Sequence, residues 1–393
     1  MNTRGQRVID CCRTLATLTE EPGRTTRTFL SPPMLEVHRQ LGNWMRSFGM
    51  RVTIDAAGNL RGVLAGDGPR LLIGSHLDTV PNAGAFDGIL GVVIGIALAE
   101  IASHHGSRPA IEAIGFSEEE GVRLGAPFIG SRAFVGTLDA ATLALAGPAI
   151  RQFGLNPENI PHAHFSPDTA AYLEFHIEQG PVLESLQLPL GIVDAIAGQS
   201  RAEIAFEGQA NHAGTTPMSH RRDALAAAAQ WIGLVEQVAA AHDGLVATAG
   251  RMQIEPNAAN VVPGRVTVSL DVRHGCDENR QAAFRQLLTG ATHIAHRRGI
   301  NIHVEPRLDQ PAVPMDAGLR ERLAAAVESA GYPVHHMTSG AGHDAMIVAP
   351  HIPSAMLFLR SPGGISHAPE EDVLVEDVEA AITAGERFLC LTS

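Results

Sequence analysis

Residues Leu71–Gly91, LLIGSHLDTVPNAGAFDGILG, join an apolar run to polar side chains and a turn-rich loop. Leu71–Ser75 predicts a buried strand followed by His76 and Asp78, which, two residues apart, project to the same side. The Pro, Asn and Gly residues predict a loop, after which Asp87 opens a helix. A His and an Asp that meet at a strand end suit a divalent metal. The alternative is that His76 caps a strand and Asp87 caps a helix.

The neighbouring segments predict an α/β fold with a mostly parallel sheet flanked by helices. Asp87–His104 is predicted to be a helix and Ala110–Ser117 a second buried strand, which gives a right-handed strand–helix–strand unit. Tyr172–Ile177 is a further apolar strand, typical of a sheet that is covered on both faces. Ligand sites of open α/β sheets lie at the carboxyl ends of such strands. His76 and the acidic run Glu118–Glu120 both fall there, which indicates a site.

The hydrophobic pattern changes at Gly198–Arg201. The segments that follow alternate polar and apolar residues or show helical periodicity: Arg201–Glu207, Arg222–Ala241, Val246–Ile254, Arg265–Val272, Glu278–Arg298 and Asn301–Glu305. Two helices with several half-exposed strands fit a separate α+β domain. We predict this inserted domain over residues 200–311, so that the first domain comprises residues 1–199 and 312–393.

Charge and composition exclude several functions. The chain has 393 residues and a formal charge of -13, which argues against nucleic acid or an anionic membrane as the main partner. It contains no lysine, which excludes Schiff-base catalysis, a Ser–Lys dyad and a P-loop lysine together. The longest apolar run, Ile89–Ala99, is well short of the roughly 20 residues that span a bilayer. We therefore expect no membrane partner.

The cysteines and the N-terminal residues indicate the compartment. The stretch MNTRGQRVIDCCRT lacks the apolar core of a signal peptide. Cys11, Cys12, Cys276 and Cys390 are sparse and show no CxxC spacing. We expect reduced thiols in a cytoplasmic protein.

Three imidazoles and three carboxylates fall at predicted strand ends or in nearby loops: His76, Asp87, Glu119, Glu120, His176 and His367. A run of glutamates is usually a solvated surface, and a lone strand histidine is usually a core residue. Here, however, the run ends a buried strand, and crowded carboxylates repel one another unless a cation lies among them. Mixed nitrogen and oxygen ligands suit Zn, Mn, Co or Ni. Two such ions that share a carboxylate can hold a hydroxide beside a substrate carbonyl.

The motifs GSHLDTV, GAFDGILG, SEEEG, FHIEQGP, NHAGTTPM and GGISHAPEE, in this order, resemble the M20 metallopeptidase superfamily over nearly the whole chain. IEQGPVLE, HAGTTPM and GAGHDA resemble one branch of it, the N-carbamoyl-L-amino-acid hydrolases, β-ureidopropionases and allantoate amidohydrolases. The resemblance implies a zinc-exopeptidase-like catalytic domain and an inserted lid domain that also forms a homodimer. It further implies hydrolysis of the carbamoyl C–N bond of a small ureido acid, an N-carbamoyl-L-amino acid first and allantoate second.

The same resemblance implies roles for single residues. His76, Asp87 and His176 would bind one of two divalent ions, and Asp87, Glu120 and His367 the other, with Asp87 as the bridge. Glu119 would be the general base, although Glu118 leaves the register of the acidic run open, and Asp78 would orient His76. The positions that would hold substrate are Gln179, His212, Asn260, Arg273 and His343.

His212 would polarise the substrate carbonyl, within one subunit or across the dimer, and Arg273 would clamp the substrate carboxylate. For each of these there is a plain alternative: a loop histidine, a surface ion pair at Arg273, and a turn at Asn260. Two departures from the family pattern bear on substrate choice. Arg360 places a charge near the last metal motif, and Leu124–Pro127 lacks the expected aromatic residue.

Other functions remain to be separated from this one. An aminoacylase or dipeptidase of the same superfamily would share the metal centre but cleave acyl- or peptidyl-amino acids. A non-catalytic binding or dimerisation protein on this fold would lack bound metal. A Ser or Cys hydrolase has no GxSxG motif to support it in this sequence.

Overall fold

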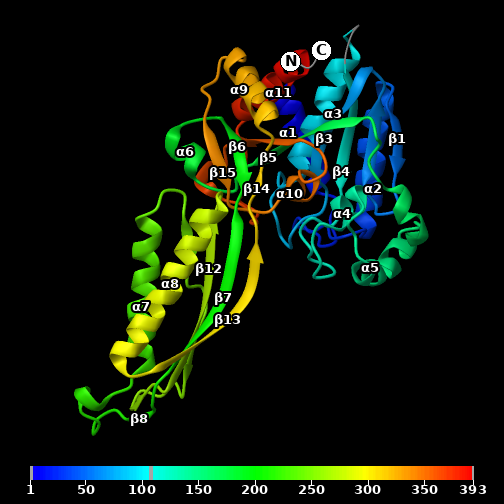
Figure 1. The fold of residues 1–393 in the computed structure, drawn as a ribbon. Helices are drawn as coiled ribbons and strands as arrows, with labels where there is room; N and C mark the ends of the chain where they lie inside the picture. Colours follow the sequence, from blue (N-terminus) through cyan, green and yellow to red (C-terminus); the bar gives the residue numbers. More distant parts are fainter. Residues whose placement is uncertain (1–2, 106–108, 392–393) are drawn as a thin grey trace. The chain divides into compact units, whose positions relative to one another are not determined.

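The computed structural model describes residues 3–105 and 109–391, which form two compact units (Figure 1). The first unit comprises Met1–Asp194, Met315–Met337 and Ala341–Ser393, and the second comprises Ala195–Pro314 and Thr338–Gly340. The predicted inserted segment, 200–311, falls inside the second unit. Its lid and dimerisation roles stay predictions.

The first unit contains a mixed sheet in the order β1-β2-β4-β3-β5-β16-β6. Its centre is parallel and consists of β4 (Pro109–Phe116), β3 (Asp67–His76), β5 (Thr169–Ile177) and β16 (Ser354–Leu359). Antiparallel strands flank this centre: β1 (Arg51–Ile54), β2 (Leu60–Leu64) and β6 (Leu190–Ile196), with β15 (His336–Ser339) also beside β6. The α/β prediction is confirmed. β6 has no counterpart among the predicted strands, because Gly191 and Asp194 interrupt its apolar pattern.

Helix α3 (Ile89–Ser103) forms the centre of the core and is buried along almost its whole length. It contacts β3, β4 and β5 on one side, and α1 (Arg4–Ala16) and α11 (Val375–Leu391) on the other (Figure 1). A Cβ at Gly91 would lie 2.0 Å from the carbonyl oxygen of Phe175, so glycine is required for this close approach to the sheet. The predicted start of this helix at Asp87 is wrong. The helix begins at Ile89, because Gly88 adopts a φ of 67° and breaks the helical path.

The remaining helices of this unit are α2 (Pro32–Ser47), α4 (Ile129–Val135), α5 (Ala140–Gln152), α6 (Val182–Leu186), α9 (Ala317–Ser329) and α10 (Asp344–Val348), with 3₁₀ turns η1 (Pro157–His162) and η3 (Pro362–Gly364). Within residues 3–105 and 109–391, no single helix is long and apolar enough to cross a membrane. Taken together, α4 and α5 have the length and apolar composition of a membrane span, but the two helices are bent by 117° relative to each other.

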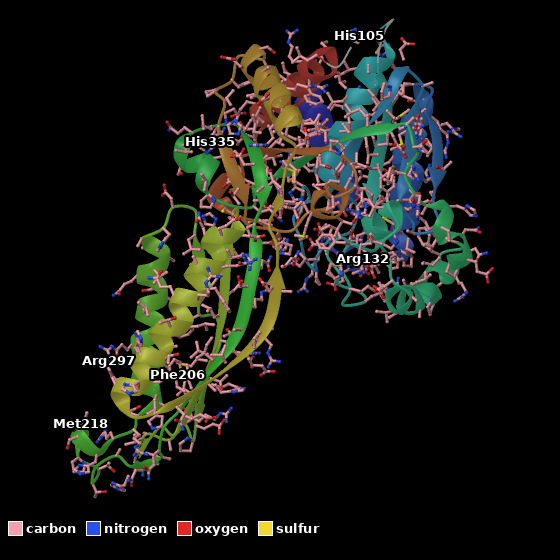
Figure 2. All side chains as sticks on the ribbon, in the orientation of Figure 1. His105, Arg132, Phe206, Met218, Arg297 and His335 are labelled. Carbon is pink, nitrogen blue, oxygen red and sulfur yellow. The ribbon has the colours of Figure 1, made fainter. Side chains whose placement is uncertain are left out.

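The second unit has an antiparallel sheet in the order β10-β12-β7-β13, with β9 also paired to β12. Its strands are β7 (Gly198–Glu207), β9 (Val246–Thr248), β10 (Met252–Glu255), β12 (Arg265–His274) and β13 (Asn301–Gln310). Helices α7 (Ala224–Ala240) and α8 (Asp277–Arg298) pack together against the sheet, on which Phe206 lies (Figure 2). The ring centroid of Phe206 is 5.8 Å from that of Trp231 on α7. The predicted strand Val246–Ile254 is split in two: β9 ends at Thr248 and β10 begins at Met252, and between them the Arg251 amide donates to the Ser269 hydroxyl at 2.9 Å.

Candidate metal centre

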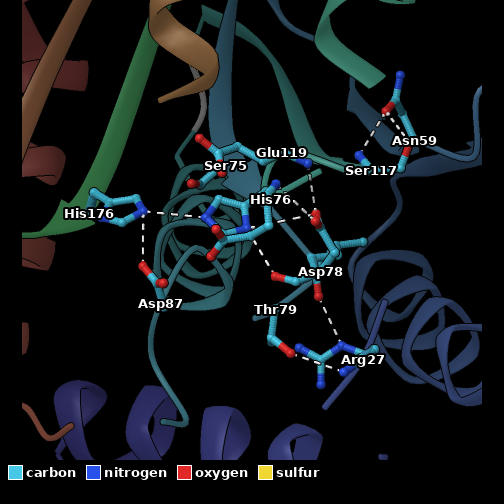
Figure 3. A network of polar contacts seen from close by, with 12 residues as sticks. Arg27, Asn59, Ser75, His76, Asp78, Thr79, Asp87, Ser117, Glu119 and His176 are labelled. Atoms are coloured by element: carbon cyan, nitrogen blue, oxygen red, sulfur yellow. Dashed lines mark hydrogen bonds and ion pairs between the residues drawn. The ribbon is translucent and has the colours of Figure 1, made fainter. Parts of the chain in front are cut away.

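His76 and His176 lie at the carboxyl ends of the adjacent parallel strands β3 and β5, and both are buried. Nδ1 of His76 lies 3.0 Å from the backbone oxygen of Asp78, and Nδ1 of His176 lies 2.9 Å from that of Ile177. Because a carbonyl only accepts, each Nδ1 carries the hydrogen. The two Nε2 atoms, 3.4 Å apart, therefore point lone pairs at each other (Figure 3).

Asp87 lies in the loop before α3, between the histidines. Its Oδ1 is 3.4 Å from Nε2 of His176, and its Oδ2 is 3.1 Å from Nε2 of His367. Burial alone would raise the pKa of Asp87, but the bond from His367 and the charges of the other two histidines outweigh it and lower the pKa. Gly88 makes this approach possible, since a Cβ there would lie 2.4 Å from the ring of His76. Asp87 is thus set to bridge two groups of ligands.

The acidic run follows β4 and enters the same site. Nε2 of His367 lies 3.5 Å from Oε1 of Glu120. Burial, together with nearby carboxylates, raises the pKa of Glu120 to about 9 and that of Glu119 well above its ordinary value. Asp87 in turn raises the pKa of His367 to about 9. Negative charge is therefore crowded here and protonation relieves it, as a bound cation also would.

The three glutamates of the run point to different partners. Oε1 of Glu118 accepts the amides of Arg123 and Leu124, both at 3.2 Å. Glu119 and Glu120 instead place carboxylate oxygens within 4.8 Å of a ring nitrogen of His76. This geometry supports the register in which Glu119 and Glu120, not Glu118, serve the site.

Asp78 differs from its predicted geometry. Its carboxylate oxygen lies 3.8 Å from Nδ1 of His76, and the backbone oxygen of Asp78 takes the imidazole hydrogen instead. The carboxylate accepts the amides of Glu119 and Glu120, both at 3.1 Å. Asp78 therefore fixes the tautomer of His76 through its main chain and positions the acidic run through its side chain.

Arg27 supports this segment and is absent from the predicted site residues. It is buried, its Nε donates to the Leu77 oxygen at 2.8 Å, and its amide donates to Oγ1 of Thr79 at 2.9 Å (Figure 3). A single arginine in the polar stretch Thr25–Thr28 gives no periodic signal, and this explains why sequence reasoning misses it.

Gln179 and His343 also lie at this site. Nε2 of Gln179 donates to Oδ1 of Asp87 at 3.0 Å. His343 is buried, with its ring centroid 4.5 Å from that of His176. Arg360, by contrast, does not offer a free charge, because Asp377 pairs with it through two bonds of 2.8 Å.

His212, Asn260 and Arg273 belong to the second unit. Strand β8 (Asn211–His212) pairs with β11 (Val261–Val262), and the Ala213 amide donates to the Asn260 oxygen at 2.9 Å, so His212 and Asn260 are neighbours. Arg273 lies near the end of another strand of this unit, β12. Its Nε and Nη2 bind Asp271 at 2.9 and 3.1 Å, and its Nη1 donates to the Gly340 oxygen at 2.7 Å.

The ligand atoms form three groups whose members lie within 4.8 Å of one another: His76, Asp87 and His176; Asp87, Glu120 and His367; and His76, Glu119 and Glu120. Asp87 is common to the first two. The facing Nε2 atoms of His76 and His176, and the buried carboxylate of Asp87 that contacts both His176 and His367, fit cations as the missing partners. Nitrogen with carboxylate oxygen suits Zn, Mn, Co or Ni.

Comparison with known proteins gives a consistent result. Residues 72–390 match the model of Peptidase family M20/M25/M40. The chain is 38% identical to an N-carbamoyl-L-amino acid amidohydrolase of Geobacillus stearothermophilus, over 95% of each protein. It is 37% identical to allantoate deiminase 2 of Glycine max, over 95% of this chain and 87% of the relative. Its fold is similar to that of a hydantoinase/carbamoylase family amidase from Burkholderia ambifaria, with a TM-score of 0.90, 32% identity, and coverage of 99% and 98% of the two chains.

Proposed function

The chain belongs to Peptidase family M20/M25/M40 and to its hydantoinase/carbamoylase amidase branch, and from this membership we propose that it hydrolyses the carbamoyl C–N bond of N-carbamoyl-L-amino acids. It is a metal-dependent amidohydrolase that acts on C–N bonds other than peptide bonds. The observation that carries the proposal is the pair of ligand groups that share Asp87, with Glu119 beside them.

Two ions, when bound, would lower the pKa of a water and polarise the substrate carbonyl. His76 and His176 would hold one ion through Nε2, and Glu120 and His367 the other, with Asp87 between them. Glu119 would take the proton of the attacking water and deliver it to the leaving amine nitrogen. Its burial and its carboxylate neighbours, which favour the protonated form, suit that acid step.

We propose that His212 donates a hydrogen bond to the carbonyl oxygen of the substrate, and the hydrogen bonds of its own ring support this role. Its Nδ1 accepts the amides of Gly214 and Thr215, both at 3.1 Å. Since Nδ1 is the acceptor, the neutral ring carries its hydrogen on Nε2. The side chain can therefore donate to a developing oxyanion without prior protonation. This holds whether His212 serves its own subunit or, in the homodimer that we propose, the other one.

Arg273 remains the proposed partner of the substrate carboxylate, but its geometry changes how it binds. The Nε–Nη2 edge is occupied by Asp271, so the carboxylate would use the Nη1–Nη2 edge, where the Gly340 oxygen is the present partner of Nη1. Asp271 then holds the guanidinium plane in place, as second partners of clamping arginines do. Asn260 would act from the same unit, beside the His212 loop.

Allantoate is the second candidate substrate, because allantoate deiminases match this chain nearly as well as the N-carbamoyl-amino-acid hydrolase does. Both substrates present a ureido group and a carboxylate. The shared metal centre also keeps N-acyl-amino acids and dipeptides as substrates to be tested.

The test measures ammonia and free-amine release from N-carbamoyl-L-amino acids, N-carbamoyl-β-alanine, allantoate, N-acetyl-L-amino acids and dipeptides, with added Mn²⁺. Wild type is compared with Glu119→Gln, and with Glu118→Gln as the matched control, since Glu118 faces the amides of Arg123 and Leu124. We expect turnover of N-carbamoyl-L-amino acids that falls about 10²–10⁴-fold in Glu119→Gln, with a much smaller loss in Glu118→Gln.

Turnover of allantoate alone would assign the second candidate. Cleavage of acyl or peptide substrates alone would overturn the carbamoyl proposal. Metal binding without turnover of any substrate would leave the substrate class unsupported, whereas undetectable metal would favour a binding protein on this fold. A larger loss in Glu118→Gln would shift the base by one residue.

A further inference from the structure

Glu371 holds the main chain of the predicted bridging ligand. It is buried, and its Oε1 accepts the amides of Phe86 and Asp87, both at 3.0 Å. The loop that carries Asp87 passes directly against it, since a Cβ at Gly84 would lie 2.4 Å from the Cβ of Glu371. One carboxylate oxygen therefore fixes two consecutive peptide groups of this loop.

The other oxygen of Glu371 continues a chain of bonds that returns to Asp87. Oε2 accepts the Ser366 hydroxyl at 3.0 Å, and the Ser366 oxygen accepts Nε2 of Gln179 at 3.2 Å. The same Nε2 donates to Oδ1 of Asp87 at 3.0 Å. A closed ring thus runs from the main chain of Asp87 through Glu371, Ser366 and Gln179 to the side chain of Asp87.

This ring joins three segments that are far apart in the sequence: the loop before α3, the end of β5 and the loop before α11. Ser366 precedes His367, which adopts a left-handed φ of 56°, a conformation that needs support from its surroundings in a non-glycine residue. Holding Ser366 therefore also holds the backbone from which His367 reaches Asp87.

We propose that Glu371 and Ser366 are positioning residues, which hold Asp87 and His367 in the geometry for metal binding and set the direction of the Gln179 carboxamide. The first part concerns metal affinity and is independent of the substrate. The second part rests on the proposed function, because it concerns which substrates the site prefers.

The direction of the carboxamide has a chemical consequence. Nε2 of Gln179 faces Oδ1 of Asp87 at 3.0 Å, Oγ of Ser366 at 3.2 Å and Nε2 of His367 at 3.3 Å, so the donor end of the carboxamide is turned toward this group. Oε1 is left as a buried acceptor with no hydrogen-bond partner in residues 3–105 and 109–391. A ureido group has an NH₂ that can donate to such an acceptor, whereas an acetyl group has a methyl in its place. A fixed Gln179 therefore favours ureides over acyl amides, because the acyl analogue leaves a buried acceptor unpaired.

The first experiment titrates metal-free protein with Mn²⁺ by calorimetry and does not depend on turnover. We expect Glu371→Ala to weaken Mn²⁺ binding about 10- to 100-fold, the usual effect of removing a partner that orients metal ligands. Glu371→Gln should stay close to wild type, because its amide oxygen can accept both backbone hydrogens. Circular dichroism and a thermal melt verify that each variant is folded.

Asp55→Ala is the matched control. The Asp55 side chain is only 6% exposed and accepts two backbone amides, those of Ala57 and Asn59. In residues 3–105 and 109–391 its side-chain hydrogen bonds and ion pairs involve none of the predicted ligands. This substitution should lower the melting temperature without weakening Mn²⁺ binding. A folded Glu371→Ala with wild-type affinity, or an equal loss in Asp55→Ala, would overturn the positioning role.

The second experiment compares kcat/KM for the N-carbamoyl and N-acetyl forms of one amino acid. We expect Ser366→Ala to lower the ureide preference about tenfold, the value of one buried hydrogen bond. Ser361→Ala is its control, since the Ser361 hydroxyl accepts the backbone amide of Gln179, at 3.0 Å, and not its carboxamide. An unchanged ratio in Ser366→Ala would overturn the specificity part. Inactivity of wild type on every ureide would overturn the proposed function, while the Mn²⁺ titration would still decide the first part.

Discussion

Nε2 of His76 and Nε2 of His176 face each other at 3.4 Å, and each ring is oriented by a backbone carbonyl that takes its Nδ1 hydrogen. When both rings are neutral, this arrangement brings two nitrogen lone pairs together, and they repel each other. Burial lowers the pKa of His76 and so opposes relief by protonation. The folded chain thus carries a local cost that a cation between the rings removes.

Metal should therefore stabilise the fold measurably. At 100 times its dissociation constant, an ion that binds only the folded state adds about 2.7 kcal/mol to the free energy of unfolding. We expect chelator-treated protein to melt at a lower temperature than the same protein with Mn²⁺ restored. His176→Ala should remove most of this difference, and exposed His351→Ala should keep it. Equal melting temperatures with and without metal would contradict this prediction.

The tautomer of His212 predicts different activities for two substitutions of this residue. Asn places an acceptor near the position of Nδ1 and so keeps the bonds from Gly214 and Thr215, whereas Gln places a donor near the position of Nε2. If the Nε2 hydrogen serves the carbonyl oxygen, His212→Asn should lose about 10²–10³-fold in kcat, and His212→Gln should lose less. Steady-state kinetics on the best ureide measures both. The reverse order would show that holding the loop is what matters.

The sequence motifs predict the residues of the site well, but they predict the contacts that surround these residues poorly. A strand end, a turn and a buried acidic run can be read locally, and so His76, Asp87 and Glu120 are predictable from the sequence. Glu371 lies 284 residues from the amide of Asp87 that it binds, and no local pattern encodes such a pairing. At Asp78, Nδ1 of His76 lies 3.0 Å from the backbone oxygen and 3.8 Å from the carboxylate, a choice set by the loop conformation, which periodicity does not specify.

A buried ion-pair triad braces β2, β3 and β4 several residues before the strand ends that carry the site. Glu112 on β4 is fully buried, with Oε1 2.6 Å from Nε of Arg61 and Oε2 2.7 Å from Nη1 of Arg70. Glu112→Ala removes the carboxylate shared by two guanidinium groups, which are left with Asp55 at 3.9 Å from Arg61 and Asp168 at 3.2 Å from Arg70. We expect a loss of about 3–5 kcal/mol in the free energy of unfolding, measured by urea denaturation.

The control for the triad is Glu36→Ala. Glu36 pairs with Arg39 on α2, and their side chains are 36% and 59% exposed, whereas that of Glu112 is fully buried. A surface pair of this kind is worth about 0–1 kcal/mol. If the two substitutions cost the same, burial of Glu112 would not be the source of its effect.

His38 gives the fold a pH dependence that is separate from the metal centre. It is buried in α2 against the edge of Phe153, and within the described residues neither ring nitrogen has a hydrogen-bond partner. Burial, with a smaller contribution from the charge of Arg27, lowers its pKa from 6.5 to about 4. The unfolded chain therefore binds a proton near pH 6.5 that the folded chain refuses until about pH 4. Because the unfolded state binds more protons in this window, stability falls as the pH falls through it.

The shift corresponds to about 3 kcal/mol, since one pKa unit is worth about 1.4 kcal/mol. We expect His38→Leu to flatten the fall in unfolding free energy between neutral and acidic pH by up to this amount, measured by urea denaturation of metal-free protein. His351→Leu, at an exposed position, should leave the slope unchanged. Parallel pH profiles for wild type and His38→Leu would mean that His38 is hydrated or paired in solution. The acid sensitivity would then have to come from other groups, such as His76 and His343, whose pKa burial also lowers.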